Sequence, residues 1–318
     1  MKVRVLVAAV LATLAPLIFT GCGDSTGPDI PLVWSTVASG TTVELDGVWG
    51  TSSSDVWAVG VGTILHFNGV SWSNLTPPTL AGGSLLNVWG SSASDVWAVG
   101  GDDAGAPSLI LHYDGMRWSN LASPTSRLLV GVWGSSASDI WAVASGGTII
   151  HYNGASWSTV PSGTTQTLLR VWGTSATDVW AVGSQTILHY DGTTWTPAPS
   201  VITTFFGLWG SSRSDVWAMG ATVLLHYDGA SWSRISNGGV VPEFPWEIWG
   251  TSRSNVWVVG SNQIGVCCTG KMSHYDGTTW SDVPVPTQVI LYDVWGSSAA
   301  DVWVVGDSGT ILHGAPAR

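Results

Sequence analysis

The chain has 318 residues, with 10 basic and 21 acidic side chains and a formal charge of −11. This acidic balance and the absence of a basic stripe argue against a nucleic-acid partner, because nucleic-acid-binding surfaces depend on clustered Lys and Arg. Only 10% of the residues are charged, whereas 40 are Gly and 22 are Trp. Such a composition suits an extracytoplasmic protein whose surface is carried by Ser, Thr and Gly.

The first segment of the chain is predicted to be a secretion signal. Lys2 and Arg4 precede an apolar run, and small residues then lead to Cys22. Phe19–Cys22 resembles a bacterial lipoprotein cleavage box, which implies cleavage before Cys22 and lipid on that residue. An ordinary signal peptide with an incidental Cys is the alternative. No other segment is apolar and long enough to span a membrane.

This interpretation divides the chain into residues 1–21 as signal peptide, 22–31 as a lipid-anchored tether and 32–318 as the folded domain. Loss of Lys2 and Arg4 with the signal takes the formal charge from −11 to −13. We therefore expect a protein of the bacterial cell envelope, anchored to a membrane and facing the periplasm or the exterior.

The rest of the chain is an internal repeat. Seven Trp-Gly pairs recur 37 to 46 residues apart, with their tryptophans at Trp49, Trp89, Trp133, Trp172, Trp209, Trp249 and Trp295. A period near 40 residues indicates an array of identical supersecondary units.

Each unit contains four short apolar runs, as in Val171–Trp195, and their β-branched and aromatic residues predict strands. A Ser-rich loop that ends in Asp, or in Asn255 once, joins the first and second strands. An Asn-Gly or Asp-Gly pair joins the third and fourth strands in six units, and such pairs close tight hairpins. The second strand is apolar on both faces, so the sheet needs cover on both sides. Seven such units predict a seven-bladed, all-β propeller of four-stranded antiparallel blades.

The two ends of the chain predict closure of the ring. The seventh unit stops at His313 without its fourth strand, whereas Val33–Thr42 resembles the fourth strand at Ser156–Thr165. We expect Trp34 to open the outer strand of the last blade, because this pairing removes an exposed seam.

One histidine occupies the same third-strand position in every unit: His66, His112, His151, His189, His226, His274 and His313. A residue that recurs seven times belongs to the unit more than to a single site. We interpret each as a structural histidine bonded to the turn Asp or to a backbone carbonyl, because buried polar groups find partners. A ring of metal ligands is not expected, since third strands lie away from the propeller axis.

The segment Asp301–His313 resembles repeats of bacterial propellers related to the photosystem II stability/assembly factors and to BNR/Asp-box proteins. The resemblance covers Val33–His313 and implies the propeller fold. The turn Asp191–Trp195 is one residue shorter than an Asp-box and lacks its preceding Ser. The signatures of WD and kelch repeats are absent, so the resemblance implies no particular activity or partner.

Candidate binding residues lie where the sevenfold pattern breaks. The connections between strands one and two and between strands three and four are nearly constant, whereas the others vary, and variable loops on a rigid frame often bind. In the sixth unit, Ser236–Glu247 and Ser261–Ser273 are predicted loops on the variable end. We expect them to bring together Glu243, Phe244, Trp246, Cys267, Cys268 and Lys271.

Further positions carry alternative interpretations. Asp102 and Asp103 lie in an insertion that is either a solvated acidic loop or, less simply, a site for a hard cation. The adjacent Cys267 and Cys268 form either a vicinal disulfide or two free thiols. The residues before the Val-Trp step are hypothesised to line the channel mouth: Gly47, Asn87, Gly131, Arg170, Gly207, Glu247 and Asp293.

The leading functional interpretation is a monomeric, lipid-anchored, non-catalytic propeller that binds an envelope protein or a glycan, with no cofactor or metal. A propeller-type hydrolase or lyase is one alternative, and it would need paired carboxylates or an activated nucleophile. An assembly factor for a membrane complex is the other, by analogy with the resembling family.

Overall fold

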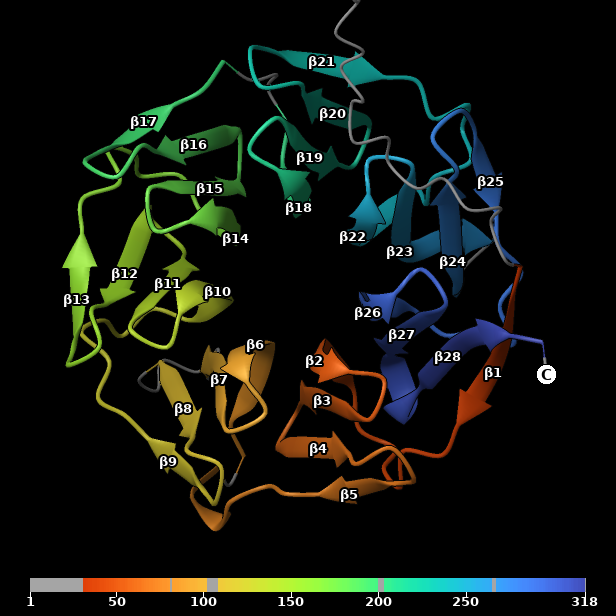
Figure 1. Ribbon diagram of the computed structural model, residues 1–318, viewed down its shortest axis with the longest axis horizontal. Helices are drawn as coiled ribbons and strands as arrows, with labels where there is room; N and C mark the ends of the chain where they lie inside the picture. The colour runs from red at the N-terminus through yellow and green to blue at the C-terminus, as the bar shows by residue number, and fades with distance from the viewer. Residues whose placement is uncertain (1–30, 81, 102–107, 200–202, 265–266, 318) are drawn as a thin grey trace, which may run out of the picture.

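The structure is a computed structural model that describes residues 31–80, 82–101, 108–199, 203–264 and 267–317, except the side chains of Ile264 and Cys267. Seven four-stranded antiparallel sheets stand around a common axis, as Figure 1 shows. The predicted seven-bladed propeller is therefore confirmed. In every blade the strands run outward from the axis in sequence order, except where the N-terminal strand completes the last blade.

The first four blades follow one another along the chain. Blade one contains β2 (Leu45–Ser52), β3 (Asp55–Gly60), β4 (Thr63–Phe67) and β5 (Trp72–Asn74). Blade two follows the short helix η1 (Pro78–Leu80) and contains β6 (Ser84–Ser92), β7 (Asp95–Gly101), β8 (Leu109–Tyr113) and β9 (Trp118–Asn120). Blade three contains β10 (Leu129–Ser136), β11 (Asp139–Ala144), β12 (Thr148–Tyr152) and β13 (Trp157–Val160). Blade four contains β14 (Leu168–Ser175), β15 (Asp178–Gly183), β16 (Thr186–Tyr190) and β17 (Trp195–Pro197).

The last three blades complete the ring. Blade five contains β18 (Phe205–Ser212), β19 (Asp215–Gly220), β20 (Val223–Tyr227) and β21 (Trp232–Ile235). Blade six contains β22 (Phe244–Ser252), β23 (Asn255–Ile264), β24 (Cys267–Tyr275) and β25 (Trp280–Asp282). Blade seven contains β26 (Leu291–Ser298), β27 (Asp301–Gly306), the short helix η2 (Asp307–Gly309), β28 (Ile311–Pro316) and β1 (Leu32–Val37).

The N-terminal strand closes the ring as expected. β1 pairs antiparallel with β28, and Trp34 lies opposite Gly314. The Trp34 ring packs edge-on against Trp257 of blade six at 5.5 Å between centroids, in the manner of the fourth-strand tryptophan Trp118 against Trp57. Where other third strands carry Tyr or Phe after the His, blade seven has Gly314, and a Cβ there would lie 2.8 Å from the Trp34 ring. The missing side chain therefore makes room for the strand that comes from the other end of the chain.

The Trp-Gly pairs join each blade to the next. A Cβ added to Gly90 would lie 2.6 Å from the Trp49 ring of the preceding blade, and one added to Gly50 would lie 2.8 Å from Trp295 of blade seven. The same contact recurs at all seven interfaces, at Gly50, Gly90, Gly134, Gly173, Gly210, Gly250 and Gly296. Glycine is thus required because an indole from the neighbouring blade occupies the space that a side chain would fill.

The core lies between the blades. The second strands are buried on both faces, and Val56, Ala58 and Val59 of β3 have no exposed surface. Trp57 stacks on His66 of its own blade and also packs against Tyr113 and Trp118 of blade two. This arrangement supplies the cover on both sides that the apolar second strands need, since an isolated sheet cannot bury both faces.

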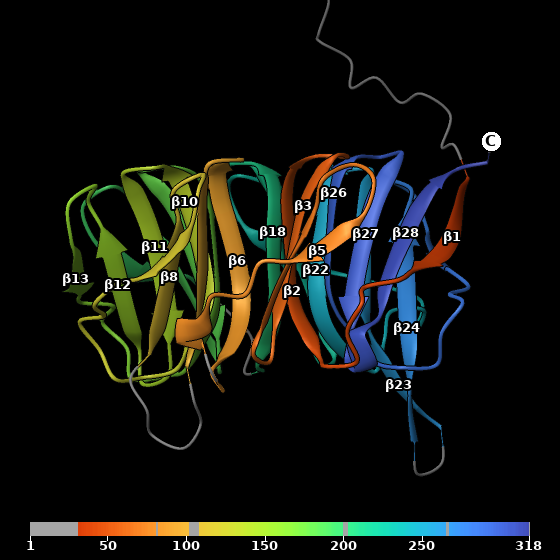
Figure 2. The same ribbon diagram turned by 90° about the horizontal axis from the view of Figure 1, so that it is seen from below.

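The two ends of the propeller differ, and we name them by their connections. The constant end carries the Ser-rich loops and the Asn-Gly or Asp-Gly hairpins, which touch one another: a Cβ at Gly69 would lie 2.7 Å from Ser54. The variable end carries the other connections, including η2 and the β23–β24 hairpin. Because Leu32 lies opposite Pro316, β1 begins at the constant end, where the C-terminus also lies (Figure 2). None of the described helices is long and apolar enough to cross a membrane.

Candidate functional site

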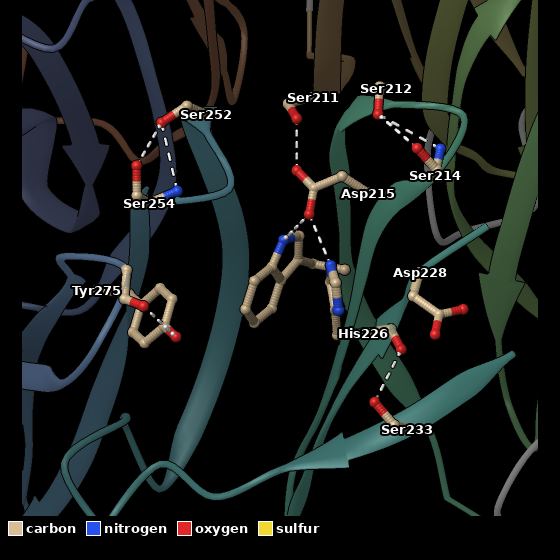
Figure 3. A network of polar contacts seen from close by, with 12 residues as sticks. Ser211, Ser212, Ser214, Asp215, His226, Asp228, Ser233, Ser252, Ser254 and Tyr275 are labelled. Atoms are coloured by element: carbon tan, nitrogen blue, oxygen red, sulfur yellow. Dashed lines mark hydrogen bonds and ion pairs between the residues drawn. The ribbon is translucent and has the colours of Figure 1, made fainter. Parts of the chain in front are cut away.

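The repeated histidines belong to the scaffold of the constant end. In six blades the histidine Nε2 lies 2.6 to 2.7 Å from the Oδ1 of the turn aspartate, as in the pairs His66–Asp55 and His226–Asp215. A Ser or Thr four residues before the aspartate donates to its other oxygen, and Figure 3 shows Asp215 between Ser211 and His226. The hydrogen bond expected between the histidine and the turn Asp is therefore present in these blades.

This network lowers the pKa of four of the turn aspartates. Burial would raise the pKa of Asp215, but the hydrogen bonds from His226, Ser211 and Trp217 outweigh it, so the pKa is lowered. Asp95, Asp139 and Asp301 show the same balance. In blade six Asn255 replaces the aspartate and accepts a hydrogen bond from Trp257 Nε1 at 2.9 Å. The carboxylates of the constant end are thus held by hydrogen bonds from side chains of their own blade.

At the variable end, a β-bulge in the first strand of every blade builds the channel mouth. In blade one Leu45 pairs with Gly60 and Gly47 pairs with Val59, so that Asp46 has no partner in the ladder. A bulge bends its strand and redirects the extra side chain. The same register shift occurs in all seven blades and defines the bulge ring: Asp46, Leu86, Val130, Leu169, Phe206, Trp246 and Tyr292.

The bulge ring lines a cavity of about 310 Å³, together with Glu44 and Arg170. Trp246 forms one aromatic wall, with its ring centroid 6.1 Å from Phe206 and 5.5 Å from Tyr292. Leu86, Val130 and Leu169 supply an aliphatic wall. A cavity of this volume, mostly apolar with a few converging polar groups, is typical of a ligand site.

Charged groups from distant blades meet beneath the cavity. The Arg170 guanidinium on β14 pairs with Glu247 on β22, and its Nη1 donates to the Leu169 carbonyl at 3.0 Å. Asp293 on β26 accepts hydrogen bonds from the backbone N–H groups of Val48 and Val294, both at 2.8 Å. Burial raises the pKa of Asp293 to about 8, with Glu247 adding to the shift. All three were hypothesised to line the channel mouth, and Arg170 lines the cavity whereas Glu247 and Asp293 do not. The Arg170–Glu247 pair links the first strands of blades four and six, and Asp293 links those of blades seven and one.

Asp46 is the charged member of the bulge ring. Burial raises its pKa to about 8, and the adjacent Glu44 raises it further through hydrogen bonding and repulsion, whereas Arg170 opposes the shift. The Oδ2 atom of Asp46 is shielded from solvent and accepts no hydrogen bond from the described residues. A buried carboxylate oxygen without a hydrogen-bond partner is costly, which disfavours the ionised form of Asp46 and agrees with its raised pKa.

The sixth-blade candidates do not form one platform. The predicted loop Ser261–Ser273 is largely strand, because β23 extends to Ile264 and β24 begins at Cys267. Glu243 bonds this hairpin through Asn262 and the Gln263 N–H, whereas Lys271 pairs with Asp282 on the outer strand at 2.5 Å. Phe244 is 46% exposed beside the hairpin. Trp246 turns instead into the channel mouth, because it occupies the bulge position.

Several candidates lie outside the described residues. Cys22, Asp102 and Asp103 are among them, as is the side chain of Cys267, so the lipid, the acidic loop and the vicinal disulfide stay predictions. Cys268 is exposed. Within the described part of the chain, no three His, Cys, Asp or Glu side chains gather as a metal site.

Sequence analysis identified Trp246 but missed the other members of the bulge ring. The signal was present two residues before each Val-Trp-Gly, Leu-Trp-Gly or Ile-Trp-Gly step, where the residue varies among Asp, aliphatic and aromatic types while the preceding residue is a buried apolar one in each blade. Variation at one position of a constant unit marks a residue that the fold does not require.

No protein-family model matches the chain, and no curated protein sequence matches it. Its fold is similar to several solved structures. YCF48 from Cyanidioschyzon merolae is 17% identical with a TM-score of 0.67, covering 89% of this chain and 99% of that one. A structure of YCF48 bound to D1 peptide is 16% identical with a TM-score of 0.70, covering 91% and 99%.

A catalytically inactive virginiamycin B lyase from Staphylococcus aureus with quinupristin is 12% identical, with a TM-score of 0.74 and coverage of 89% and 99%. At these identities the likeness concerns the fold. The chain is a seven-bladed β-propeller whose structural neighbours include the photosystem II assembly factor YCF48, in agreement with the resemblance that its repeats suggested.

Proposed function

We propose that this protein is a non-catalytic, lipid-anchored scaffold of the bacterial cell envelope that binds a protein partner at its variable end. The observation that carries the proposal is the bulge ring. Seven bulges place the varying residues of the repeat around one cavity of about 310 Å³ at that end. The YCF48 structure with D1 peptide supports the choice of a protein ligand, because it is a propeller of similar fold with a bound peptide.

The position of β1 supports the anchoring. Leu32 lies at the constant end, so a tether of residues 22–31 would leave the domain there. If lipid on Cys22 anchors the protein to a membrane, the constant end would face that membrane and the channel mouth would face away from it. Labelling with a palmitate analogue tests the anchor: the wild-type chain should incorporate the label, and a Cys22→Ala variant that still labels would refute it.

Site-specific photocrosslinking in intact envelopes tests the binding. A photoreactive side chain is placed at Phe244 on the variable end, and a matched one at Met116, which is 89% exposed in a hairpin turn of the constant end. We expect one saturable protein adduct from position 244 and none of that mass from position 116. Equal adducts from both ends would overturn the proposal, and binding on a glycan array with no protein adduct would replace the protein by a glycan.

An enzyme is the second candidate, and Asp46 is the observation that favours it. A carboxyl group with a pKa raised to about 8, in a ligand-sized cavity, is a possible general acid, and the lyase neighbour shows that a fold of this kind can carry catalysis. Turnover of an envelope polysaccharide that is abolished by Asp46→Asn would establish this candidate in place of the non-catalytic scaffold.

A further inference from the structure

We infer that the channel mouth binds a primary ammonium group, namely a lysine side chain that the partner protein inserts between the aromatic wall and the carboxyl groups of Glu44 and Asp46. This inference rests on the proposed protein-binding function and specifies the chemistry of the partner. Two features of the cavity carry it: its aromatic wall and its pair of acidic side chains, Glu44 and Asp46.

The aromatic wall suits an organic cation. One side of the cavity is lined by Trp246, Phe206 and Tyr292. The ring planes of Phe206 and Tyr292 are tilted by 58° and 76° against that of Trp246. Tryptophan is the ring that attracts a cation most strongly, and the attraction grows where water is excluded. A hard metal ion would instead need six or more oxygen ligands, whereas most of this lining is carbon.

The two acidic side chains favour an ammonium over a guanidinium. Glu44 shares a hydrogen bond with the Asp46 carboxyl, and the Oδ2 atom of Asp46 is left shielded and unpartnered among the described residues. A guanidinium binds best through two parallel hydrogen bonds to both oxygens of one carboxylate. Because Oδ2 is shielded, Asp46 cannot offer both of its oxygens to a guanidinium, whereas the compact ammonium has three donors and can reach the carboxyl groups of Asp46 and Glu44 together.

The charge of the surroundings favours a cation as well. Glu44, Asp46, Asp293 and Glu247 face or underlie the cavity, and Arg170 is the basic group among them. The Arg170 guanidinium is already paired with Glu247 and bonded to the Leu169 carbonyl. Its charge is therefore largely offset by Glu247, which leaves Glu44 and, above about pH 8, also Asp46 and Asp293 to attract the ligand.

Proton linkage gives the inference a signature. The groups that face Asp46 are Glu44, Arg170, Asp293, Glu247 and Tyr292, and its carboxyl ionises with a pKa of about 8. A lysine ammonium stays protonated up to a pKa of about 10.4. Since an ionised carboxylate holds an ammonium more strongly than a neutral acid does, affinity should rise by more than about fivefold between about pH 6.5 and about pH 9.

The test uses the full chain in detergent and a blocked peptide, acetyl-Gly-Ala-Lys-Ala-Gly-amide, titrated by calorimetry. Two control peptides carry norleucine or ε-acetyl-lysine in place of lysine. We expect binding of the lysine peptide alone, with the pH dependence given above. Binding of the norleucine peptide with equal affinity, or an affinity that falls towards pH 9, would overturn the inference.

Two variants locate the binding. Asp46→Asn keeps the size of the side chain and should weaken the lysine peptide about tenfold, because a charge-assisted hydrogen bond is lost. Trp246→Ala should weaken it about fivefold through the lost cation–π contact, whereas Phe244→Ala, on the same strand but outside the cavity lining, should not. Melting curves identify a variant that fails to fold, and unchanged affinity in both folded variants would contradict the inference.

The two failures can be told apart. A protein adduct at position 244 that survives both Asp46→Asn and Trp246→Ala would leave the proposed function standing and reject the lysine site. Lysine-peptide binding that both variants weaken, with no protein adduct from intact envelopes, would support the site and reject the proposed function.

Discussion

The constant end and the channel mouth both place carboxyl groups in buried surroundings, but they treat them differently. At the constant end, Asp215 accepts hydrogen bonds from His226, Ser211 and Trp217, and its pKa is lowered. At the channel mouth, Asp46 meets Glu44 and the apolar bulge ring, and its pKa rises to about 8. The first arrangement is repeated and completes the hydrogen bonds of its carboxylate, whereas the second occurs once and leaves one oxygen of Asp46 without a partner among the described residues.

In this fold, side chains that recur from blade to blade stabilise the scaffold, whereas side chains that differ between blades are available for function. Groups whose hydrogen bonds are completed within the unit recur in nearly every blade and hold it together. The bulge position of each blade instead carries a side chain that varies from blade to blade, and it faces the axis and not a neighbouring blade. Perturbing the two regions should therefore affect different properties, stability at one end and binding at the other.

The largest expected effect is loss of ring closure. Deleting residues 31–39 removes β1 and the Trp34 contact with Trp257 and exposes the edge of β28. We expect a cooperative loss of stability of about 3 kcal/mol or more, in the range for removing a packed tryptophan, measured by chemical denaturation. The matched change Trp246→Ala, which removes a tryptophan from the cavity and not from a blade interface, should cost much less. An unchanged melting temperature after the deletion would contradict the closure.

The next effect is loss of one bonded pair at the constant end. His226→Ala removes one of the three hydrogen bonds that the Asp215 carboxylate accepts, and we expect a loss of about 1 to 3 kcal/mol, with a similar loss for Asp215→Ala. The double variant should lose less than the sum of the two, because both changes remove the same bond. Asp228→Asn in the exposed hairpin of the same blade is the control and should leave stability nearly unchanged. Strict additivity would show that the bond does not couple the two residues.

The two ends should also differ in how stability depends on pH. The lowered pKa values of Asp95, Asp139, Asp215 and Asp301 mean that their contribution is present above about pH 4, the unfolded value, and is lost as the pH falls through the folded pKa values. For Asp46 and Asp293 the folded pKa is raised to about 8, so their contribution is present below about pH 4 and is lost as the pH rises towards 8.

Denaturation free energies measured from about pH 2.5 to about pH 9 test this opposition. We expect steep destabilisation below about pH 4 from the turn aspartates and a gradual decline between about pH 4 and 8 from the channel mouth. Asp46→Asn should flatten the gradual decline and leave the destabilisation below about pH 4 unchanged. If Asp46→Asn altered only the destabilisation below about pH 4, the assignment of the two regions would be reversed.

The architecture could be predicted from the sequence because each repeat contains the local signals for its own strands and turns. Asn-Gly and Asp-Gly turns, β-branched runs and an Asp or Asn after each Ser-rich loop are short-range signals, and their repetition in six or seven units makes them unambiguous. Closure through Trp34 was predictable for the same reason, since the missing fourth strand resembles its six copies. The β23–β24 hairpin was missed because it continues two strands beyond their usual length, where no other repeat offers a template.

The channel mouth could not be predicted from the sequence in the same way. The pairing of Arg170 with Glu247 joins residues 77 apart in the chain, and the pattern of one repeat does not contain it. The bulge at Asp46 depends on a register shift between β2 and β3, and alternation of side chains along an uninterrupted strand would have placed Asp46 differently. Trp246 was singled out correctly as the tryptophan outside the repeat, but its direction required the bulge.

The smallest expected effect concerns Asp46 itself, and it makes the comparison quantitative. Asp46→Asn removes a carboxyl group that the folded state holds near its neutral form, so ionisation at about pH 8.5 no longer opposes folding. We expect the melting temperature at that pH to stay the same or to rise slightly, whereas the equivalent Asp215→Asn at the constant end should lower it, because the carboxylate there accepts three hydrogen bonds. Scanning calorimetry of the two variants measures this difference. A clear drop in melting temperature for Asp46→Asn would mean that Asp46 is part of the scaffold, and the functional role of the channel mouth would have to rest on the aromatic wall alone.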